Sequence, residues 1–252
     1  MLRNRYNMFK WALVLVAKVV FILASVASTS AASDEDEIIA LKDARLKIEL
    51  NATSNDAGIQ VFIDADPWKW MEIYDPYGKM IFRSTTQGRL AKQGGTELFL
   101  ESAEPNFSQL TLEKFLERFP QGKYHFRGKG MAGETMVGNA MLTHNLPKGP
   151  TLVSPLPGQG LVDPNNAVIM WQPVAAPNGS PIVGYQVLVV QLQSNFPAIP
   201  KVTLDVMMPA TATSMTVPRG FLSPDTEYEW EVLAIETSGN QTLSTSFFRT
   251  AP

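Results

Sequence analysis

The sequence predicts an all-β protein: two antiparallel β-sandwich domains in tandem, the first with one short helix, preceded by a signal peptide. Hydrophobic and polar residues alternate along much of the chain from residue 44, which is the period of a half-buried strand. The run Leu-Pro-Lys-Gly-Pro at 146–150 interrupts this pattern and is typical of a stiff connection. We therefore expect one domain at 44–147 and a second at 148–252.

Residues 1–32 have the composition of a secretory signal peptide. The first ten residues carry three basic side chains, residues 11–27 are apolar apart from one lysine, and small residues follow. A membrane anchor formed by residues 11–27 is the alternative, although 17 residues are few for a span that needs about 20. We expect cleavage, a secreted or periplasmic location, and a mature chain that starts with an acidic segment at 33–43.

The composition excludes several classes of function. The 252 residues include no cysteine and only two histidines, which rules out disulfides and cysteine nucleophiles and leaves little for zinc or histidine catalysis. Residues 1–32 hold four of the 21 basic residues and none of the 24 acidic ones, so the remaining chain has a net charge of −7. An acidic chain disfavours nucleic acid and anionic membranes. We expect neither as a partner, apart from the signal segment at the membrane.

The first domain is predicted to contain paired strands. The turn Asp75-Pro76-Tyr77-Gly78 has the proline and glycine that favour a hairpin. The alternation predicts strands at 46–52 and 59–65, a hairpin of 69–74 with 79–83, and a second hairpin of 124–127 with 135–142.

One segment of the first domain has helical spacing instead. Four apolar residues between Leu112 and Phe119 recur at i, i+3, i+4 and i+7, which predicts a short amphipathic helix near 111–119. Thr111 is placed to cap this helix and Pro120 to end it. We expect the helix to cover one end of the sandwich rather than to bind a partner, because the core needs its apolar face.

The second half carries three sequence features of its own. A tryptophan ends an alternating stretch, a Gly-Tyr pair lies near the start of a long apolar strand, and a Leu-x-Pro-x-Thr-x-Tyr run precedes another strand. These features are Trp171, Gly184-Tyr185 and Leu222–Tyr228.

Together these features resemble a fibronectin type III domain over about residues 150–252. The resemblance implies that Trp171 is a core residue of the second strand and that Tyr228 forms the corner in which a tyrosine hydroxyl binds the backbone. It also implies a spacer or a binding scaffold, but the fold does not specify which partner is bound. Members that bind integrins carry Arg-Gly-Asp in a loop. The corresponding loop at 237–241 lacks it, so the resemblance does not imply integrin binding here.

The first domain looks only generally immunoglobulin-like, with an added helix. Its position ahead of the second domain resembles exported bacterial proteins of unassigned function. Neither resemblance implies a particular site in this domain.

The best candidate ligand-binding residues are aromatic. Strand alternation would place Trp68, Trp70 and Tyr74 on one face, opposite Met71 and Ile73. If the latter two residues face the core, the three aromatic side chains form an outer stripe that can hold a sugar ring or an apolar partner. The alternative, which we favour, is that the tryptophan face belongs to the core or lies under the helix.

Two groups of acidic residues are weaker candidates. Asp56, Asp64 and Asp66, with Asn55, offer oxygen ligands for Ca²⁺, but they lack the spacing of a known loop and we expect no metal site.

A pair of carboxylates from Glu97, Glu101 and Glu104 would suit glycoside hydrolysis, yet nothing in the sequence predicts a cleft. No nucleophile elbow, phosphate-binding loop or zinc motif occurs, so we expect no enzyme and no cofactor.

We therefore expect an exported, non-enzymatic binding or spacer protein of the cell envelope or exterior, acting through protein–protein contacts. Its partner would be a protein or a glycan at the cell surface. One alternative is a carbohydrate-binding module that uses Trp68, Trp70 and Tyr74. Another is an accessory protein to an extracellular polysaccharide enzyme.

Overall fold

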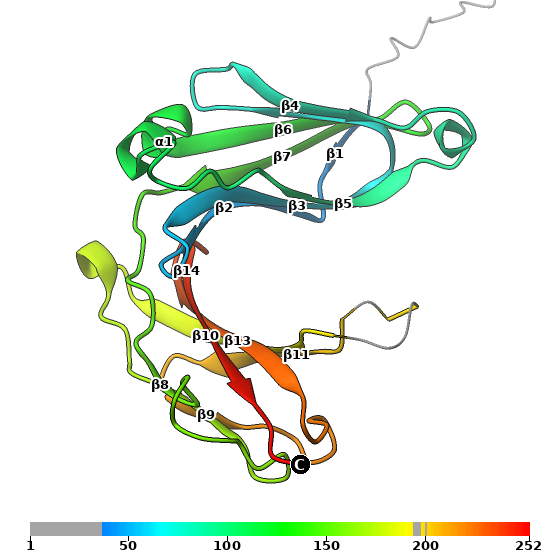
Figure 1. Cartoon of the computed structure of the whole chain (residues 1–252). Coiled ribbons are helices and arrows are strands. Elements are labelled where there is room, and N and C mark those ends of the chain that lie inside the picture. The colour runs from blue at the N-terminus through cyan, green and yellow to red at the C-terminus, as the bar shows by residue number, and fades with distance from the viewer. Residues whose placement is uncertain (1–36, 194–197, 200) are drawn as a thin grey trace, which may run out of the picture. The chain divides into compact units, whose positions relative to one another are not determined.

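The structure is a computed structural model that describes residues 37–193, 198–199 and 201–252 (Figure 1). The expected signal peptide and the alternative anchor at 11–27 lie outside these residues. The described residues belong to one compact unit. No helix within them is long and apolar enough to cross a bilayer.

The first domain is a β-sandwich with one helix. Figure 1 shows β4, β6 and β7 in one layer, β2 and β5 in the other, and α1 at one end. The elements are β1 (Ile38–Ala40), β2 (Asp43–Asn51), β3 (Asp56–Tyr74), β4 (Met80–Thr85), the 3₁₀ turn η1 (Leu90–Lys92), β5 (Gly95–Glu101), α1 (Leu112–Arg118), β6 (Gly122–Gly130) and β7 (Thr135–Leu142).

Strand β3 belongs to both layers of this sandwich. Its first half pairs with β2 and β5, whereas its second half pairs with β4 and β6. The strand remains unbroken because the register shifts near Asp64, Trp68 and Trp70 let the chain bend without ending. The two strands predicted at 59–65 and 69–74 are therefore one.

The first core lies between the two layers and under α1. It is formed mainly by β2, β3, β6 and β7, with Phe115 entering from the helix. The helix is present where it was predicted, with the Thr111 hydroxyl accepting a hydrogen bond from the Lys114 backbone N–H at 3.4 Å. Its apolar residues pack on the core, as expected of a helix that covers a sandwich.

The second domain is an antiparallel sandwich with its own core. One sheet has the order β12-β9-β8, and the strands β14-β13-β10-β11 form the other layer. The elements are β8 (Leu152–Ser154), β9 (Val168–Trp171), the 3₁₀ turn η2 (Pro177–Gly179), β10 (Ile182–Gln191), β11 (Thr203–Pro209), β12 (Ser214–Thr216), β13 (Glu227–Glu236) and β14 (Gln241–Arg249).

A short parallel pairing between β14 and β2 joins the sheets of the two domains. Gln241, Thr242 and Leu243 lie opposite Glu49, Leu50 and Asn51, and the backbone continues the sheet from β3 and β2 into β14 and β13. The pairs β1–β7 and β14–β2 are parallel, and the other strand pairs of the described residues are antiparallel, which agrees with the predicted mostly antiparallel fold.

Asn240 binds the two domains together from the turn before β14. It is 1% exposed, and its side-chain oxygen accepts the Ile48 backbone N–H at 2.9 Å. Its amide nitrogen donates to the backbone oxygens of Thr143 at 2.9 Å and Asn145 at 3.2 Å. One side chain of the second domain thus satisfies backbone groups of two segments of the first.

Candidate functional site

The structure separates the three predicted aromatic residues. Trp68 is 4% exposed and belongs to the core, because the register shift between Trp68 and Trp70 interrupts the alternation. The three-residue outer stripe is therefore wrong for Trp68, whereas the favoured alternative of a core position is confirmed for this residue. Met71 and Ile73 face the core, and Trp70 and Tyr74 remain on the opposite, half-buried face.

Trp68 packs directly over Gly95 of β5. A Cβ atom at Gly95 would lie 2.7 Å from the Cζ2 atom of the indole ring, so the absence of a side chain there makes room for the ring. The indole N–H of Trp68 has no hydrogen-bond partner. This tryptophan fills the core and has no route to a ligand.

The outer face of the second half of β3 carries a regular grid of side chains. Trp70, Glu72 and Tyr74 alternate with the buried residues of the strand, between β4 and β6. Trp70 lies between Thr85 and Lys129, Glu72 between Arg83 and Arg127, and Tyr74 between Met80 and His125. We call the set Trp70, Glu72, Tyr74, Arg83, Lys123, His125, Arg127 and Lys129 the cationic face.

Glu72 organises the middle of the cationic face. It is 7% exposed, it accepts a hydrogen bond from the Tyr74 hydroxyl at 2.7 Å, and it lies 3.4 Å from the Arg83 guanidinium. The hydrogen bond to Glu72 raises the pKa of Tyr74. The Arg83 guanidinium also lies over Trp70, 5.6 Å from the ring centroid, in a cation–π contact. A single carboxylate thus orients an arginine and a tyrosine, and the arginine stacks on the tryptophan.

The basic residues of this face were not among the candidates predicted from the sequence. The signal that identifies them is the run Lys123-Tyr124-His125-Phe126-Arg127, which Lys129 continues. Basic and apolar residues alternate in it with the period of a strand, and β6 buries Tyr124 and Phe126 while it exposes Lys123, His125 and Arg127 and leaves Lys129 half-buried.

A second cluster on the first domain is acidic. Carboxylate oxygens of Glu49, Glu101 and Glu104 all lie within 4.8 Å of one another. Gly58 makes this possible, because a Cβ atom there would lie 2.8 Å from the Cγ atom of Glu104. Burial, followed by the charges of Glu49 and Glu101, raises the pKa of Glu104 to about 7.

Part of this acidic cluster was predicted from the sequence. Glu101 and Glu104 come together, but Glu97 does not join them, and Glu49 was missed because only strand pairing brings it there. Glu49 accepts a hydrogen bond from the Gln241 amide, which ties it to the junction between the domains. Burial raises the pKa of Glu49 as well. The cluster is part of the junction.

The aspartates considered for Ca²⁺ do not converge. Asp56 and Asp64 are separated by eight residues of one extended strand, a distance of about 27 Å. Asp66 forms an ion pair with Lys42 at 2.8 Å. Within the described part of the chain, the glutamate cluster is the one group of three such ligands that meets.

The signature residues of the second domain are structural. Trp171 lies in the core, and the Tyr228 hydroxyl accepts the backbone N–H of Ser223 at 2.8 Å. The Trp230 indole N–H donates to the backbone oxygen of Pro155 at 3.0 Å. These contacts hold the sandwich and leave the signature residues no binding role.

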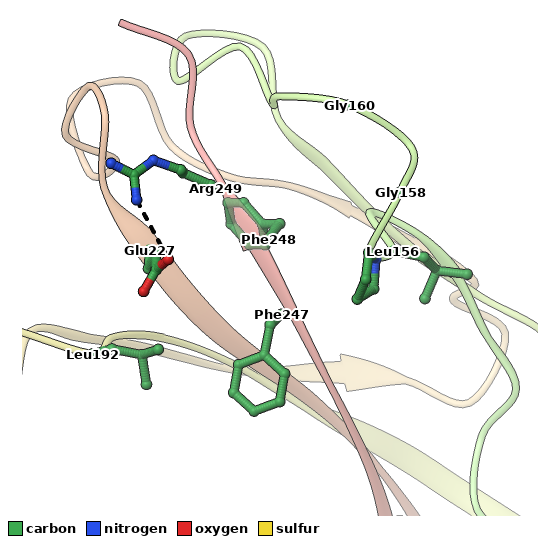
Figure 2. A pocket seen from close by; sticks show the side chains of 9 residues that line it. Leu156, Gly158, Gly160, Leu192, Glu227, Phe247, Phe248 and Arg249 are labelled. Carbon is green, nitrogen blue, oxygen red and sulfur yellow. Dashed lines mark hydrogen bonds and ion pairs between the residues drawn. The ribbon is translucent and has the colours of Figure 1, made fainter.

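The second domain also has a hollow of about 420 Å³ beside β14 (Figure 2). Leu156, Leu192 and the half-exposed Phe247 line it. The ion pair between Arg249 and Glu227, at 3.3 Å, lies at its edge (Figure 2). This lining is apolar with one charged pair and carries no arrangement for catalysis.

Comparison with known protein families identifies the second domain. A family profile for the fibronectin type III domain matches residues 160–250. Residues 160–250 are a fibronectin type III domain. Its tyrosine corner and core tryptophan have the positions that the resemblance implied. A search of curated proteins found no match.

Several solved structures are similar to this chain. The chain is similar to the fibronectin(III)-like modules of Clostridium thermocellum CbhA, with a TM-score of 0.34, 10% identity, and coverage of 84% of this chain and 93% of that one. It is also similar to chicken CNTN1 domains FN1–FN3, with a TM-score of 0.29, 12% identity, and coverage of 86% and 68%.

Proposed function

We propose that this chain is an exported, non-enzymatic spacer and binding protein of the cell envelope or exterior. In this proposal the fibronectin type III domain acts as a rigid support for the first domain, whose surface meets the partner. The observation that carries the proposal is the continuous backbone pairing of β14 with β2.

The junction supports the spacer role because it restricts movement between the domains. The β-pairing is reinforced by the backbone hydrogen bond from Ala52 N–H to Leu243 oxygen at 2.9 Å. The buried amide of Asn240 adds hydrogen bonds to three backbone groups of the first domain. Domains that are joined only by a flexible linker move relative to each other and do not share buried contacts of this kind.

The rigidity of the junction can be measured in the full chain. Because the chain has no cysteine, the paired substitutions Ser108→Cys and Thr211→Cys introduce the only two sites for spin labels, one exposed position in each domain. We expect a single narrow distance distribution by double electron–electron resonance, which Asn240→Ala broadens. A broad distribution in the otherwise unchanged chain would contradict the spacer proposal.

Export is the second part of the proposal, and mass spectrometry of the protein recovered from its native cells tests it. We expect a mature N-terminus close to residue 33, with the four basic residues of 1–32 removed. Recovery of a protein that retains Met1 would contradict the proposed cleavage and favour an anchor at 11–27.

A carbohydrate-binding role is the second candidate function. It is favoured by Trp70 and Tyr74, which remain on the outer face of β3 beside basic residues. Trp68 takes no part in it, since it is buried. An accessory role beside an extracellular polysaccharide enzyme would follow from the same surface, and a glycoside hydrolase encoded by an adjacent gene would favour it.

A further inference from the structure

We propose that the cationic face binds an acidic polysaccharide, a linear chain of sugars that carry carboxylate or sulfate groups. This inference deepens the binding part of the proposed function and rests on it. It identifies the class of partner and the surface that recognises it.

The first argument is charge. Arg83, Lys123, Arg127 and Lys129 contribute four positive charges to the face, against the single carboxylate of Glu72. Residues 33–252 as a whole have a net charge of −7, so this face differs in sign from the chain that carries it. Such a local reversal attracts an anionic partner to one surface.

Glu72 and Arg83 offset each other's charge, so the named side chains of the face have a net charge of about +3. The carboxylate of Glu72 is buried, it accepts the Tyr74 hydroxyl, and it pairs with Arg83. Glu134 lies in the turn beyond Lys129, where its carboxylate accepts the Ala132 backbone N–H at 3.1 Å. Both carboxylates are therefore engaged with the protein's own donors.

The second argument is shape. Alternate residues of a strand point to the same face about 7 Å apart, so the basic positions from Lys123 to Lys129 extend over about 20 Å. The neighbouring strands place Trp70 and Tyr74 on one side of this row and Asn139 on the other. A sheet face of this length suits an extended chain rather than a compact ligand.

The third argument is the aromatic content of the face. Trp70 and Tyr74 offer ring surfaces on which the apolar side of a sugar can lie, while guanidinium groups pair with its acidic substituents. An acidic peptide offers carboxylates on flexible side chains and no flat ring for Trp70. A nucleic acid duplex carries a denser charge, one phosphate per about 1.7 Å of helix axis, and keeps its bases stacked inside and away from Trp70. An acidic sugar chain therefore uses the rings and the cations together.

The binding test uses polygalacturonate and dextran sulfate as acidic probes, with dextran as the uncharged control, polyglutamate as the acidic peptide and oligothymidylate as the nucleic acid. We expect the full chain to bind both acidic polysaccharides at low ionic strength at least tenfold more tightly than dextran, polyglutamate or oligothymidylate. Added salt should weaken this binding. Tighter binding of polyglutamate or oligothymidylate than of the polysaccharides would overturn the proposal in favour of that partner class.

Matched variants locate the binding surface. Lys123→Gln with Arg127→Gln removes two exposed charges of the face, and Lys114→Gln with Arg118→Gln removes two exposed charges of α1. We expect at least a tenfold loss of affinity for the first pair and no change for the second. Equal losses for both pairs would show a non-specific charge effect and overturn the site.

The aromatic contribution has its own variant. Trp70→Leu keeps an apolar side chain on the strand and removes the ring, so we expect about a fivefold to tenfold loss of polysaccharide affinity with unchanged circular dichroism. Full affinity in this variant would overturn the role of ring stacking. The spin-label distances report the junction independently, so a failure of binding and a failure of the spacer proposal are distinguishable.

Discussion

Asn240 makes its contacts across the boundary between the domains. A buried asparagine is stable only when its amide groups are paired, and the partners of Asn240 are backbone groups of the first domain. The Asn240 side chain thus links the two domains specifically. From the sequence alone, its loop is notable only because it lacks Arg-Gly-Asp.

Asn240→Ala should lower the free energy of unfolding by about 2 kcal/mol, because the Ile48 backbone N–H and two carbonyl oxygens lose a partner. Urea unfolding measures the change. The control is Asn139→Ala, which removes an exposed amide and should alter stability by less than about 0.5 kcal/mol. Equal effects of the two substitutions would contradict the role of Asn240.

Gly95→Ala should destabilise the first domain by about 2 kcal/mol, because the new methyl group would overlap the indole ring of Trp68. Thermal unfolding followed by tryptophan fluorescence measures the effect. The neighbouring exposed change Thr96→Ala is the control. A neutral Gly95→Ala would show that Trp68 moves freely, contrary to its place in the core.

At the scale of elements, the first half of β3 and the glutamate cluster beside it lie where the first domain meets the second. The first half of β3 lies beside β2, and β2 in turn pairs with β14. Glu49, Glu101 and Glu104 gather at this point, with Glu231 of β13 contributing charge to Glu104. Burial raises the pKa of Glu231 as well. Acidic groups at one junction make its stability depend on pH.

Stability should therefore fall as the pH rises from about 5 to 8. The folded chain holds the proton of Glu104 up to a pKa of about 7, whereas the ordinary pKa of the group is 4.5. Unfolding releases this proton between those values, so the stabilisation is complete below pH 4.5 and is lost as the pH passes 7. Solvent screening of the exposed carboxylate limits the effect to about 1 kcal/mol.

Urea unfolding at pH 5 and pH 8 measures this dependence. Glu104→Gln should reduce it and should stabilise the chain at pH 8, since the substitution removes the repelled charge. Glu97→Gln, outside the cluster, serves as the control. The explanation fails if the two variants keep the same pH dependence as the unchanged chain.

At the scale of the whole molecule, two hydrophobic cores are joined through one continuous sheet. The first core is formed by residues of 39–146 and the second by residues of 152–248. Each sandwich encloses its own apolar side chains, while β2 and β14 cover each other's edges. Separation of the domains would leave both strands exposed.

The isolated fragment 148–252 should be less stable and should self-associate, because the edge of β14 near Gln241 would be uncovered. Size-exclusion chromatography with light scattering measures the mass of the fragment. Gln241→Lys in the same fragment places a charge on this edge and should restore the monomer. A monomeric, fully stable unaltered fragment would contradict the structural role of the pairing.

Much of this architecture could be predicted because its signals are local. The helix at α1 follows from the spacing of its four apolar residues and its threonine cap, and the tyrosine corner follows from one short run ending at Tyr228. The alternation could not separate buried Trp68 from half-buried Trp70, since a single register shift moves a side chain to the other face. Glu49 joined Glu101 and Glu104 only through strand pairing.

The sequence by itself determined the β-sandwich class, the position of the helix and the fibronectin type III character of the second domain, because alternation and turn residues act over a few neighbouring positions. Tertiary structure alone decided which tryptophan is buried, where the cations gather and how β14 meets β2. These features depend on the register of strands that are distant in sequence, and no local pattern specifies that register.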